Sequence, residues 1–188
     1  MNVYDFDQTI FHPDSSVSFF LYCLRRYPRQ VLHAALPSLV QSAIYLFNGK
    51  RDAKKLKEAL FSFLNRIEDV EDTVADFWNE HFCQIATWYL EQKKDDDLII
   101  SASPEFLLKP ATDRLGVSLI ATRMNPYTGK ISGKNCHDYE KCRRFSELYS
   151  TDEIDEFYSD SLSDEPMAML AEKAYLVDYM ERSAWPNR

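Results

Sequence analysis

The second half of the chain alternates between short apolar runs and helical stretches, and this alternation limits the fold more than any other feature of the sequence. The strand-like runs lie at residues 98–100, 117–122, 154–158 and 174–179. A helical pattern separates each run from the next, and strands that alternate with helices form a parallel sheet covered by helices on both faces. The sequence therefore predicts an α/β fold with a parallel sheet.

Turn and cap residues sharpen this prediction. Ser103, followed by Pro104 and an acidic residue, has the chemistry of a helix start, with Ser103 as the capping residue. Gly116 is placed where a glycine commonly ends a helix. The segment NPYTGKISG predicts a hairpin with Gly129 at its tip.

One further strand is expected at residues 2–6, and a helical pattern then extends from Ser15 to about Lys94. Within this block, residues 71–94 place apolar side chains three and four apart, as one continuous helix would. A crossover between parallel strands needs only a dozen or more residues. The block is therefore predicted to be an inserted helical subdomain. The expected division is an α/β core of residues 1–14 and 85–188 with a helical insert of residues 15–84.

Composition narrows the possible partners and the cellular setting. The 188-residue chain has a net charge of −8 and a pI of about 5.0, which argues against nucleic acid, because binding to its phosphate backbone requires a cationic surface. A small phosphorylated ligand needs only one or two local cations. The four cysteines are scattered and form neither a zinc motif nor a disulfide framework. The motif of acidic residues begins almost at the first methionine, so no signal peptide is expected and a cytoplasmic location is predicted.

Residues 31–47 are apolar but shorter than the 20 or so residues that span a membrane. One interpretation is a buried helical pair that breaks at Pro37. The alternative is a peripheral membrane contact, aided by the preceding Arg25, Arg26 and Arg29.

Acidic and hydroxyl side chains follow three of the expected strands. Asp5 and Asp7 end the first strand, Ser101 ends the second, and Asp160 follows the strand near residue 158. Each could be an ordinary turn or cap residue. In open α/β sheets, however, ligands bind beyond the carboxyl ends of the strands. Their joint occurrence at these ends therefore indicates one functional site, to which Lys141 on the preceding helix could contribute.

The chemistry of this set favours phosphate transfer. Clustered carboxylates without histidine or cysteine partners match a hard cation, and Mg²⁺ suits a site that also holds phosphate. A serine hydroxyl, a lysine and the backbone N–H groups of a helix start can hold phosphate oxygens. Asp5 could then attack phosphorus, while Asp7 protonates the leaving alcohol and later activates water. Residues two apart in a strand point to the same side, which suits this pairing.

These segments also resemble a known family. DFDQT, the serine of LIISASP, the lysine of NCHDYEKCRRF and DSLSD resemble, in order, the four motifs of the haloacid dehalogenase (HAD) superfamily. The helical insert resembles the type-1 cap of this superfamily. The residues of the motifs are similar to those of subfamily IB, the phosphoserine-phosphatase-like branch. The resemblance implies a Rossmann-like core and a Mg²⁺-dependent phosphomonoester hydrolase that forms an aspartyl-phosphate.

Carried over by position, the resemblance implies a role for each motif residue. Asp5 is the nucleophile and a metal ligand. Asp7 is the general acid and base, and it binds the metal through its backbone carbonyl. Ser101 and Lys141 bind the transferring phosphoryl group.

The remaining motif positions imply supporting roles. Asp160 is a Mg²⁺ ligand, Asp164 supports the metal shell, and Thr9 braces the first loop. Two residues depart from the usual pattern: Gln8 replaces a more common glycine or serine, and Ser159 stands where many relatives have glycine.

The expected substrate is a small phosphorylated metabolite, either phosphoserine-like or another phosphorylated alcohol. Three alternatives stay open: a lipid-phosphate phosphatase at the membrane, similar to those acting on phosphatidylglycerophosphate; a phosphoryl transferase; and a non-catalytic phosphate- or metal-binding module.

Overall fold

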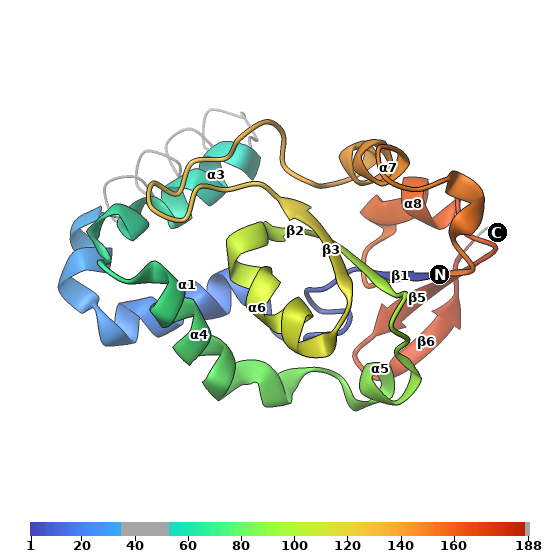
Figure 1. Cartoon of the computed structure of the whole chain (residues 1–188), viewed down its shortest axis with the longest axis horizontal. Helices are drawn as coiled ribbons and strands as arrows, with labels where there is room; N and C mark the ends of the chain where they lie inside the picture. The colour runs from blue at the N-terminus through green and yellow to red at the C-terminus, as the bar shows by residue number, and fades with distance from the viewer. Residues whose placement is uncertain (35–52, 187–188) are drawn as a thin grey trace.

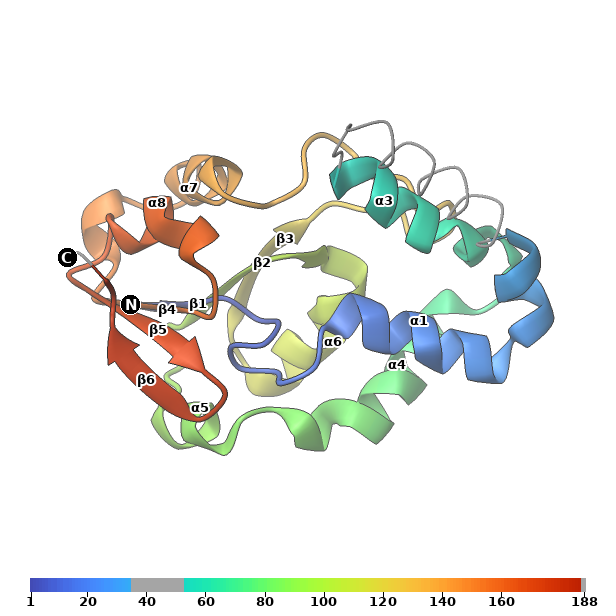
Figure 2. The same ribbon diagram turned by 180° about the vertical axis from the view of Figure 1, so that it is seen from behind.

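A computed structural model of the chain describes residues 1–34 and 53–186. Its centre is a six-stranded sheet in the order β3-β2-β1-β4-β5-β6 (Figures 1 and 2). The strands are β1 (Asn2–Tyr4), β2 (Leu98–Pro104), β3 (Ser118–Thr122), β4 (Glu156–Ser159), β5 (Lys173–Asp178) and β6 (Glu181–Ala184). Strands β1 to β5 are parallel, as predicted, and β6 runs antiparallel to β5.

Helices bury both faces of the sheet. Alternate residues of a strand point to opposite faces, so neighbouring residues of β1 pack against different helices. Val3 packs in one apolar cluster with residues of α7 and α8, whereas Tyr4 packs in a second cluster with residues of α5 and α6. These helices are α5 (Thr87–Gln92), α6 (Glu105–Leu115), α7 (Tyr139–Ser146) and α8 (Glu165–Ala168). The predicted α/β fold is therefore confirmed.

Unlike α5, three other described helices between β1 and β2 gather beside the sheet, away from β4, β5 and β6 (Figures 1 and 2). They are α1 (Ser15–Arg26), α3 (Ala53–Leu60) and α4 (Val70–His81), with short 3₁₀ turns at Ser62–Arg66 and Phe82–Gln84. The boundaries of the insert at residues 14 and 85 stay predictions. Of the apolar segment 31–47, residues 35–47 lie outside the described part of the chain, and so does the predicted break at Pro37. None of the described helices is long and apolar enough to span a membrane.

The prediction of one helix over residues 71–94 is wrong. Helix α4 ends at His81, and the chain is extended at Ile85 before α5 begins. Ala86 N–H donates to the Ile10 carbonyl over 2.7 Å, and Ile85 pairs with Phe11 in an antiparallel bridge. These bonds to the loop after β1 hold the backbone of residues 85 and 86, so tertiary contacts override a helical apolar pattern.

The predicted start of helix α6 is also wrong in detail. Strand β2 continues through Pro104, and Ser103 is not a capping residue. Its hydroxyl is bound to the Asp7 carboxylate instead. The predicted end is confirmed, because Gly116 follows α6 with a left-handed φ of 73°. Strand β6 was not predicted, since all four of its residues are exposed and show no apolar alternation.

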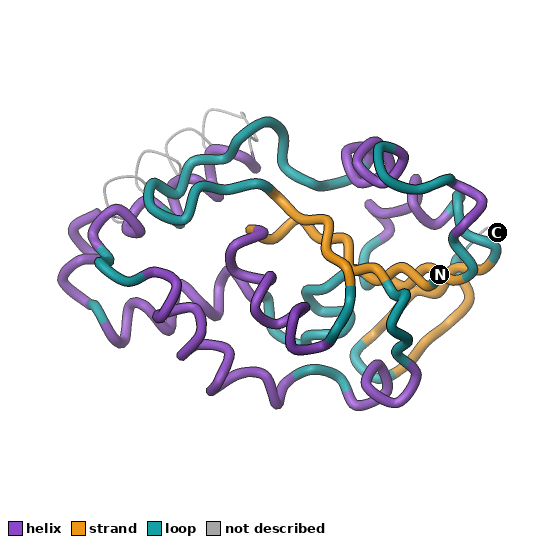
Figure 3. Tube along the Cα trace, viewed as in Figure 1, coloured by secondary structure: helices purple, strands orange, loops and turns teal. Residues whose placement is uncertain are grey.

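A hairpin between β3 and α7 links the sheet to the inserted helices. Met124 and Ile131 form an antiparallel bridge around Gly129, whose φ of 67° confirms the predicted turn. The hairpin lies along α3 (Figure 3), and there Glu58 accepts from the Ile131 N–H over 2.9 Å. Lys54 of α3 donates to the Gly133 carbonyl over 2.7 Å.

Substitution of Gly129 by alanine is expected to destabilise the protein by about 1–3 kcal/mol. The added Cβ would lie 2.4 Å from the Phe61 carbonyl oxygen, so the hairpin or the insert must move. Gly133→Ala is the matched control, because Gly133 also has a positive φ but open space beside it. Urea unfolding of both variants measures the free energy that the clash with Phe61 costs. An equal loss of stability in the two variants would assign the effect to backbone strain alone.

Candidate active site

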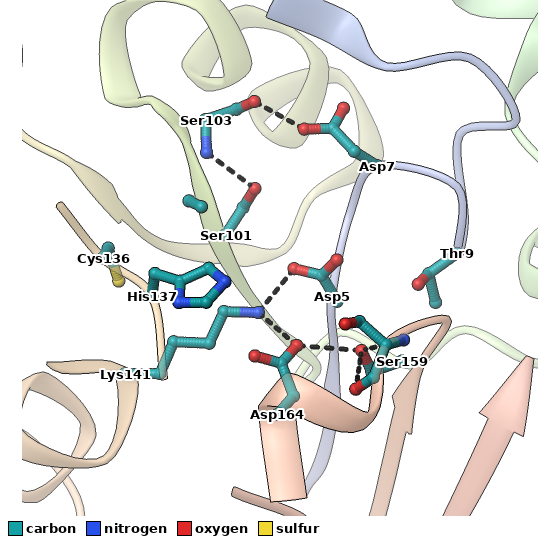
Figure 4. A network of polar contacts seen from close by, with 12 residues as sticks. Asp5, Asp7, Thr9, Ser101, Ser103, Cys136, His137, Lys141, Ser159 and Asp164 are labelled. Carbon is teal, nitrogen blue, oxygen red and sulfur yellow. Dashed lines mark hydrogen bonds and ion pairs between the residues drawn. The ribbon is translucent and has the colours of Figure 1, made fainter. Parts of the chain in front are cut away.

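One cavity of about 400 Å³ lies at the carboxyl ends of β1, β2 and β4. The structure brings six of the residues singled out from the sequence to this cavity: Asp5, Asp7, Ser101, Lys141 and Asp164, which Figure 4 shows, and Asp160. The seventh, Thr9, contacts Asp160 beside the cavity. Parallel strands place their ends at one edge of the sheet, which explains this convergence from distant parts of the chain.

Lys141 connects two buried carboxylates at the floor of the site. Its Nζ donates to Asp5 Oδ1 over 2.7 Å and to Asp164 Oδ2 over 2.6 Å, and Lys141 is only 2% exposed. Ser159 also donates to Asp164 Oδ2 over 2.8 Å. Ser159, which stands where many relatives have glycine, therefore helps to hold the Asp164 carboxylate, and this carboxylate in turn holds Lys141.

Negative charge is in excess at this floor, since two carboxylates share one ammonium. Burial raises the pKa of Asp5 above its usual range, although Lys141 opposes this effect. Burial alone would lower the pKa of Lys141, but the two carboxylates outweigh it and raise that pKa. Burial also raises the pKa of Asp160. A cation beside these carboxylates would stabilise their ionised forms.

Asp7 is held by two different elements. Its Oδ1 accepts from the Ser15 N–H, at the start of α1, over 2.7 Å. Its Oδ2 accepts from the Ser103 hydroxyl, in β2, over 2.5 Å. Burial raises the pKa of Asp7 to about 6, while these donors partly offset the effect. A carboxyl group that titrates near neutral pH suits proton transfer in both directions.

The loop after β1 is tied to the loop after β4. Asp160 N–H donates to Thr9 Oγ1 over 3.0 Å, and the Thr9 hydroxyl lies 3.3 Å from Asp160 Oδ1. This geometry agrees with a bracing role for Thr9. The unusual Gln8 has a left-handed φ of 58° and an exposed side chain. Gln8 also lines the cavity, and its positive φ places it in a turn where glycine fits without strain.

The donor set at this edge fits Mg²⁺. The carboxylates of Asp5 and Asp160 and the backbone carbonyl of Asp7 would hold the ion. Within residues 1–34 and 53–186, no group of three or more His, Cys, Asp or Glu side chains forms a ready-made metal cage. Magnesium sites that also bind phosphate commonly use only one or two carboxylates and leave the other positions to water and phosphate. All-oxygen donors and the excess buried negative charge are consistent with that type of site.

Lys57 and His137 are among the lining residues that sequence reasoning missed. Lys57 comes from α3 and donates to the Ala102 carbonyl over 2.6 Å and to Asn135 Oδ1 over 3.2 Å. Burial lowers the pKa of Lys57. His137 Nε2 lies 3.4 Å from the Ser163 hydroxyl, and both residues line the cavity. Lys57 lies in no quoted motif, and His137, although it lies within NCHDYEKCRRF, was given no role there, so no signal in the sequence identified either residue.

Helix α7, which carries Lys141, starts from a strained residue. Asp138 has φ 55° and ψ −134°, a region that residues other than glycine rarely adopt, and its side chain makes no capping bond. Asp138→Gly is therefore expected to stabilise the protein by about 1 kcal/mol, after part of the strain relief is offset by the entropy of the unfolded chain. Asp138→Ala, which keeps a Cβ, should give no such gain. Urea unfolding compares the two, and a similar gain in both would disprove the assignment of strain.

Residues 3–169 match the family model of the haloacid dehalogenase-like hydrolases. The match covers most of the chain, and the protein belongs to this family. No curated protein matches the sequence.

Several solved structures share the fold. A protein of unknown function from Bordetella pertussis Tohama I aligns with a TM-score of 0.70 and 20% identity, over 93% of this chain and 87% of that one. A phosphoserine phosphohydrolase-like protein from Francisella tularensis subsp. tularensis SCHU S4 aligns with a TM-score of 0.53 and 15% identity, over 93% and 86%. A HAD family hydrolase from Salmonella enterica serovar Typhi gives a TM-score of 0.57 and 13% identity, over 91% of this chain and 60% of that one.

Proposed function

We propose that this protein is a Mg²⁺-dependent phosphomonoester hydrolase that works through an aspartyl-phosphate on Asp5. The observation that carries the proposal is the convergence of Asp5, Asp7, Ser101 and Lys141 on one cavity of a HAD-family fold. A nucleophile, a proton carrier and two phosphate-binding groups are what phosphoryl transfer requires.

In the first step, an oxygen of Asp5 attacks phosphorus and the bond to the leaving alcohol breaks. Lys141 and the Ser101 hydroxyl hold the oxygens of the transferring group, while Asp7 donates its proton to the departing alcohol oxygen. Mg²⁺, when bound, neutralises charge between the phosphate and the carboxylates.

In the second step, Asp7 accepts a proton from water as that water attacks the phosphorus of the aspartyl-phosphate. The bond between phosphorus and the Asp5 oxygen breaks, inorganic phosphate leaves, and Asp5 is again a free carboxylate. The same residue therefore serves first as acid and then as base.

A small phosphorylated alcohol is the substrate class that the cavity supports best. Beyond the phosphate-binding floor, its wall contains Val17, Leu56 and Leu60 together with the Lys57 ammonium. A volume of about 400 Å³ is within the range of pockets that bind small molecules.

A lipid phosphate at the membrane is the second candidate, and the described residues give it less support. Arg25 pairs with Glu80 and Arg26 pairs with Asp76, each over 3.1 Å, so both of these cations are already engaged with helix α4. We also propose a cytoplasmic setting, with which the four unpaired cysteines agree.

A phosphate-release screen tests the proposal. Phosphoserine, sugar phosphates, nucleotides, an aryl phosphate and a short-chain lipid phosphate are each incubated with the protein, with Mg²⁺ or with a chelator. We expect release from at least one soluble phosphate monoester in Mg²⁺ and none in chelator. No release from any compound would refute the hydrolase proposal. Release from the lipid phosphate alone, with binding to anionic vesicles at low salt, would favour the membrane candidate.

A further inference from the structure

We propose that Ser103 is a positioning residue that holds the Asp7 carboxyl group in line for proton transfer to the leaving alcohol, and that the serines opening α1 hold Ser103 in turn. This inference rests on the proposed phosphatase function. No motif assigns Ser103 a role, and its role as a helix cap is excluded by the structure.

The hydrogen bonds that Ser103 Oγ accepts leave only one direction for the proton of its own hydroxyl group. Ser103 is 2% exposed, and its Oγ lies 3.1 Å from Ser15 Oγ and 2.9 Å from Ser16 Oγ. When both of these hydroxyls donate, they fill the two acceptor positions of Ser103 Oγ. The Ser103 proton is then directed to Asp7 Oδ2, 2.5 Å away.

Asp7 is consequently held at both oxygens. Ser103 binds Oδ2 from the sheet, and the Ser15 N–H binds Oδ1 from the first turn of α1. Two donors on opposite oxygens fix the plane of the carboxyl group, which a single donor would leave free to rotate. Proton transfer requires such alignment, since misplacement by about 1 Å can cost on the order of a hundredfold in rate.

The two serines of β2 occupy different parts of the cavity. Ser103 points to Asp7, whereas Ser101 lies along the same strand toward Asp5 and Lys141 (Figure 4). Ser101 Oγ accepts from the Ser103 N–H over 3.1 Å, so the pair is also internally tied. We therefore assign Ser101 to the phosphate side of the reaction and Ser103 to the proton side.

This assignment predicts that the effect of replacing Ser103 depends on the leaving group of the substrate. An alkyl phosphate expels a basic alkoxide and needs Asp7 as acid, whereas an aryl phosphate with an acidic phenol needs little protonation. Ser103→Ala should lower kcat/KM for the alkyl phosphate by about tenfold to a hundredfold, and for the aryl phosphate by less than about threefold. The ratio kcat/KM reports only the steps up to formation of the aspartyl-phosphate, so the later role of Asp7 as base does not enter.

The experiment compares wild type, Ser103→Ala, Ser103→Thr and Ser118→Ala on the best alkyl phosphate from the screen and on p-nitrophenyl phosphate. Ser118 is exposed at the start of β3 and far from the cavity in the fold, so its variant should match wild type on both compounds. Ser103→Thr keeps the hydroxyl and should recover most of the alkyl activity.

Each outcome decides the matter. A selective loss on the alkyl phosphate supports the inference. An equal loss on both compounds, or a loss confined to a higher KM, overturns it and makes Ser103 a phosphate ligand or a structural residue. If Ser103→Ala does not fold, the Ser15→Ala, Ser16→Ala double variant should show the same selectivity, and its absence overturns the inference. Inactive wild type on both compounds would instead refute the proposed function itself.

Discussion

Replacing Lys141 by methionine is expected to abolish turnover and to destabilise the folded protein by about 3–5 kcal/mol. Lys141 is 2% exposed and is the shared partner of Asp5 and Asp164. Methionine matches its length but leaves two buried carboxylates facing each other without the ammonium. The cost of uncompensated buried charge exceeds what a new apolar contact can return.

Urea unfolding and the phosphate-release assay measure the two effects. Lys109→Met is the matched control, because Lys109 also lies on a helix but is 56% exposed and pairs with Asp113 on the surface. Its stability should change by less than about 1 kcal/mol and its activity should match wild type. A Lys141→Met variant as stable as Lys109→Met would contradict the view that Lys141 neutralises the floor of the site.

The sequence was sufficient to predict that the polar residues following the strands meet at this site. A parallel sheet brings the carboxyl ends of its strands to one edge, so Asp5, Ser101 and Asp160 had to converge once the strands were recognised. Strand alternation was also the basis for expecting Asp5 and Asp7 in one site; both line the cavity, but β1 ends at Tyr4 and they lie in the loop after it. Chemistry-bearing residues at strand ends are therefore readable from sequence, because topology alone places them.

Contacts between residues that are far apart in the sequence could not be predicted in this way. Ser103 has the local pattern of a helix cap, and only the arrival of Asp7 and α1 gives its hydroxyl a different partner. Lys57 reaches the cavity from the insert, and no local pattern distinguishes it from the other lysines of α3. The break of the helix at Ile85 also results from contacts between distant segments. The helical pattern continues in the sequence, but the backbone of residues 85 and 86 is hydrogen-bonded to the loop after β1.

Gln8 shows an intermediate case. The sequence identified it as an unusual residue within the first motif, and the structure shows it in a left-handed turn, exposed and among the residues that line the cavity. A residue can therefore be recognised as atypical from pattern alone, whereas the reason requires the backbone angle.

Asp5→Asn is expected to reduce phosphatase activity by at least about 10⁴-fold, because an amide cannot act as the carboxylate nucleophile. Asp7→Asn should cost about 10²–10⁴-fold, the usual contribution of general acid–base catalysis. Both variants keep the size of the side chain, and each removes one ionisable group from the same cavity. The two losses alone therefore do not separate the nucleophile from the proton carrier.

The phosphorylated state of the protein separates them. With an aryl phosphate, Asp7→Asn should still form the aspartyl-phosphate, because the phenol leaves without a proton, and should then accumulate it, because no base activates water. Asp5→Asn should never form it. Mass spectrometry of acid-quenched protein detects the added phosphoryl group, and peptide mapping should place it at Asp5. An adduct in Asp5→Asn, or one mapped to Asp7, would exchange the two roles. Lys141, which Asp164 holds in turn, fixes Asp5, whereas Ser15 and Ser103 fix Asp7, so the two carboxylates have separate supports that suit separate roles.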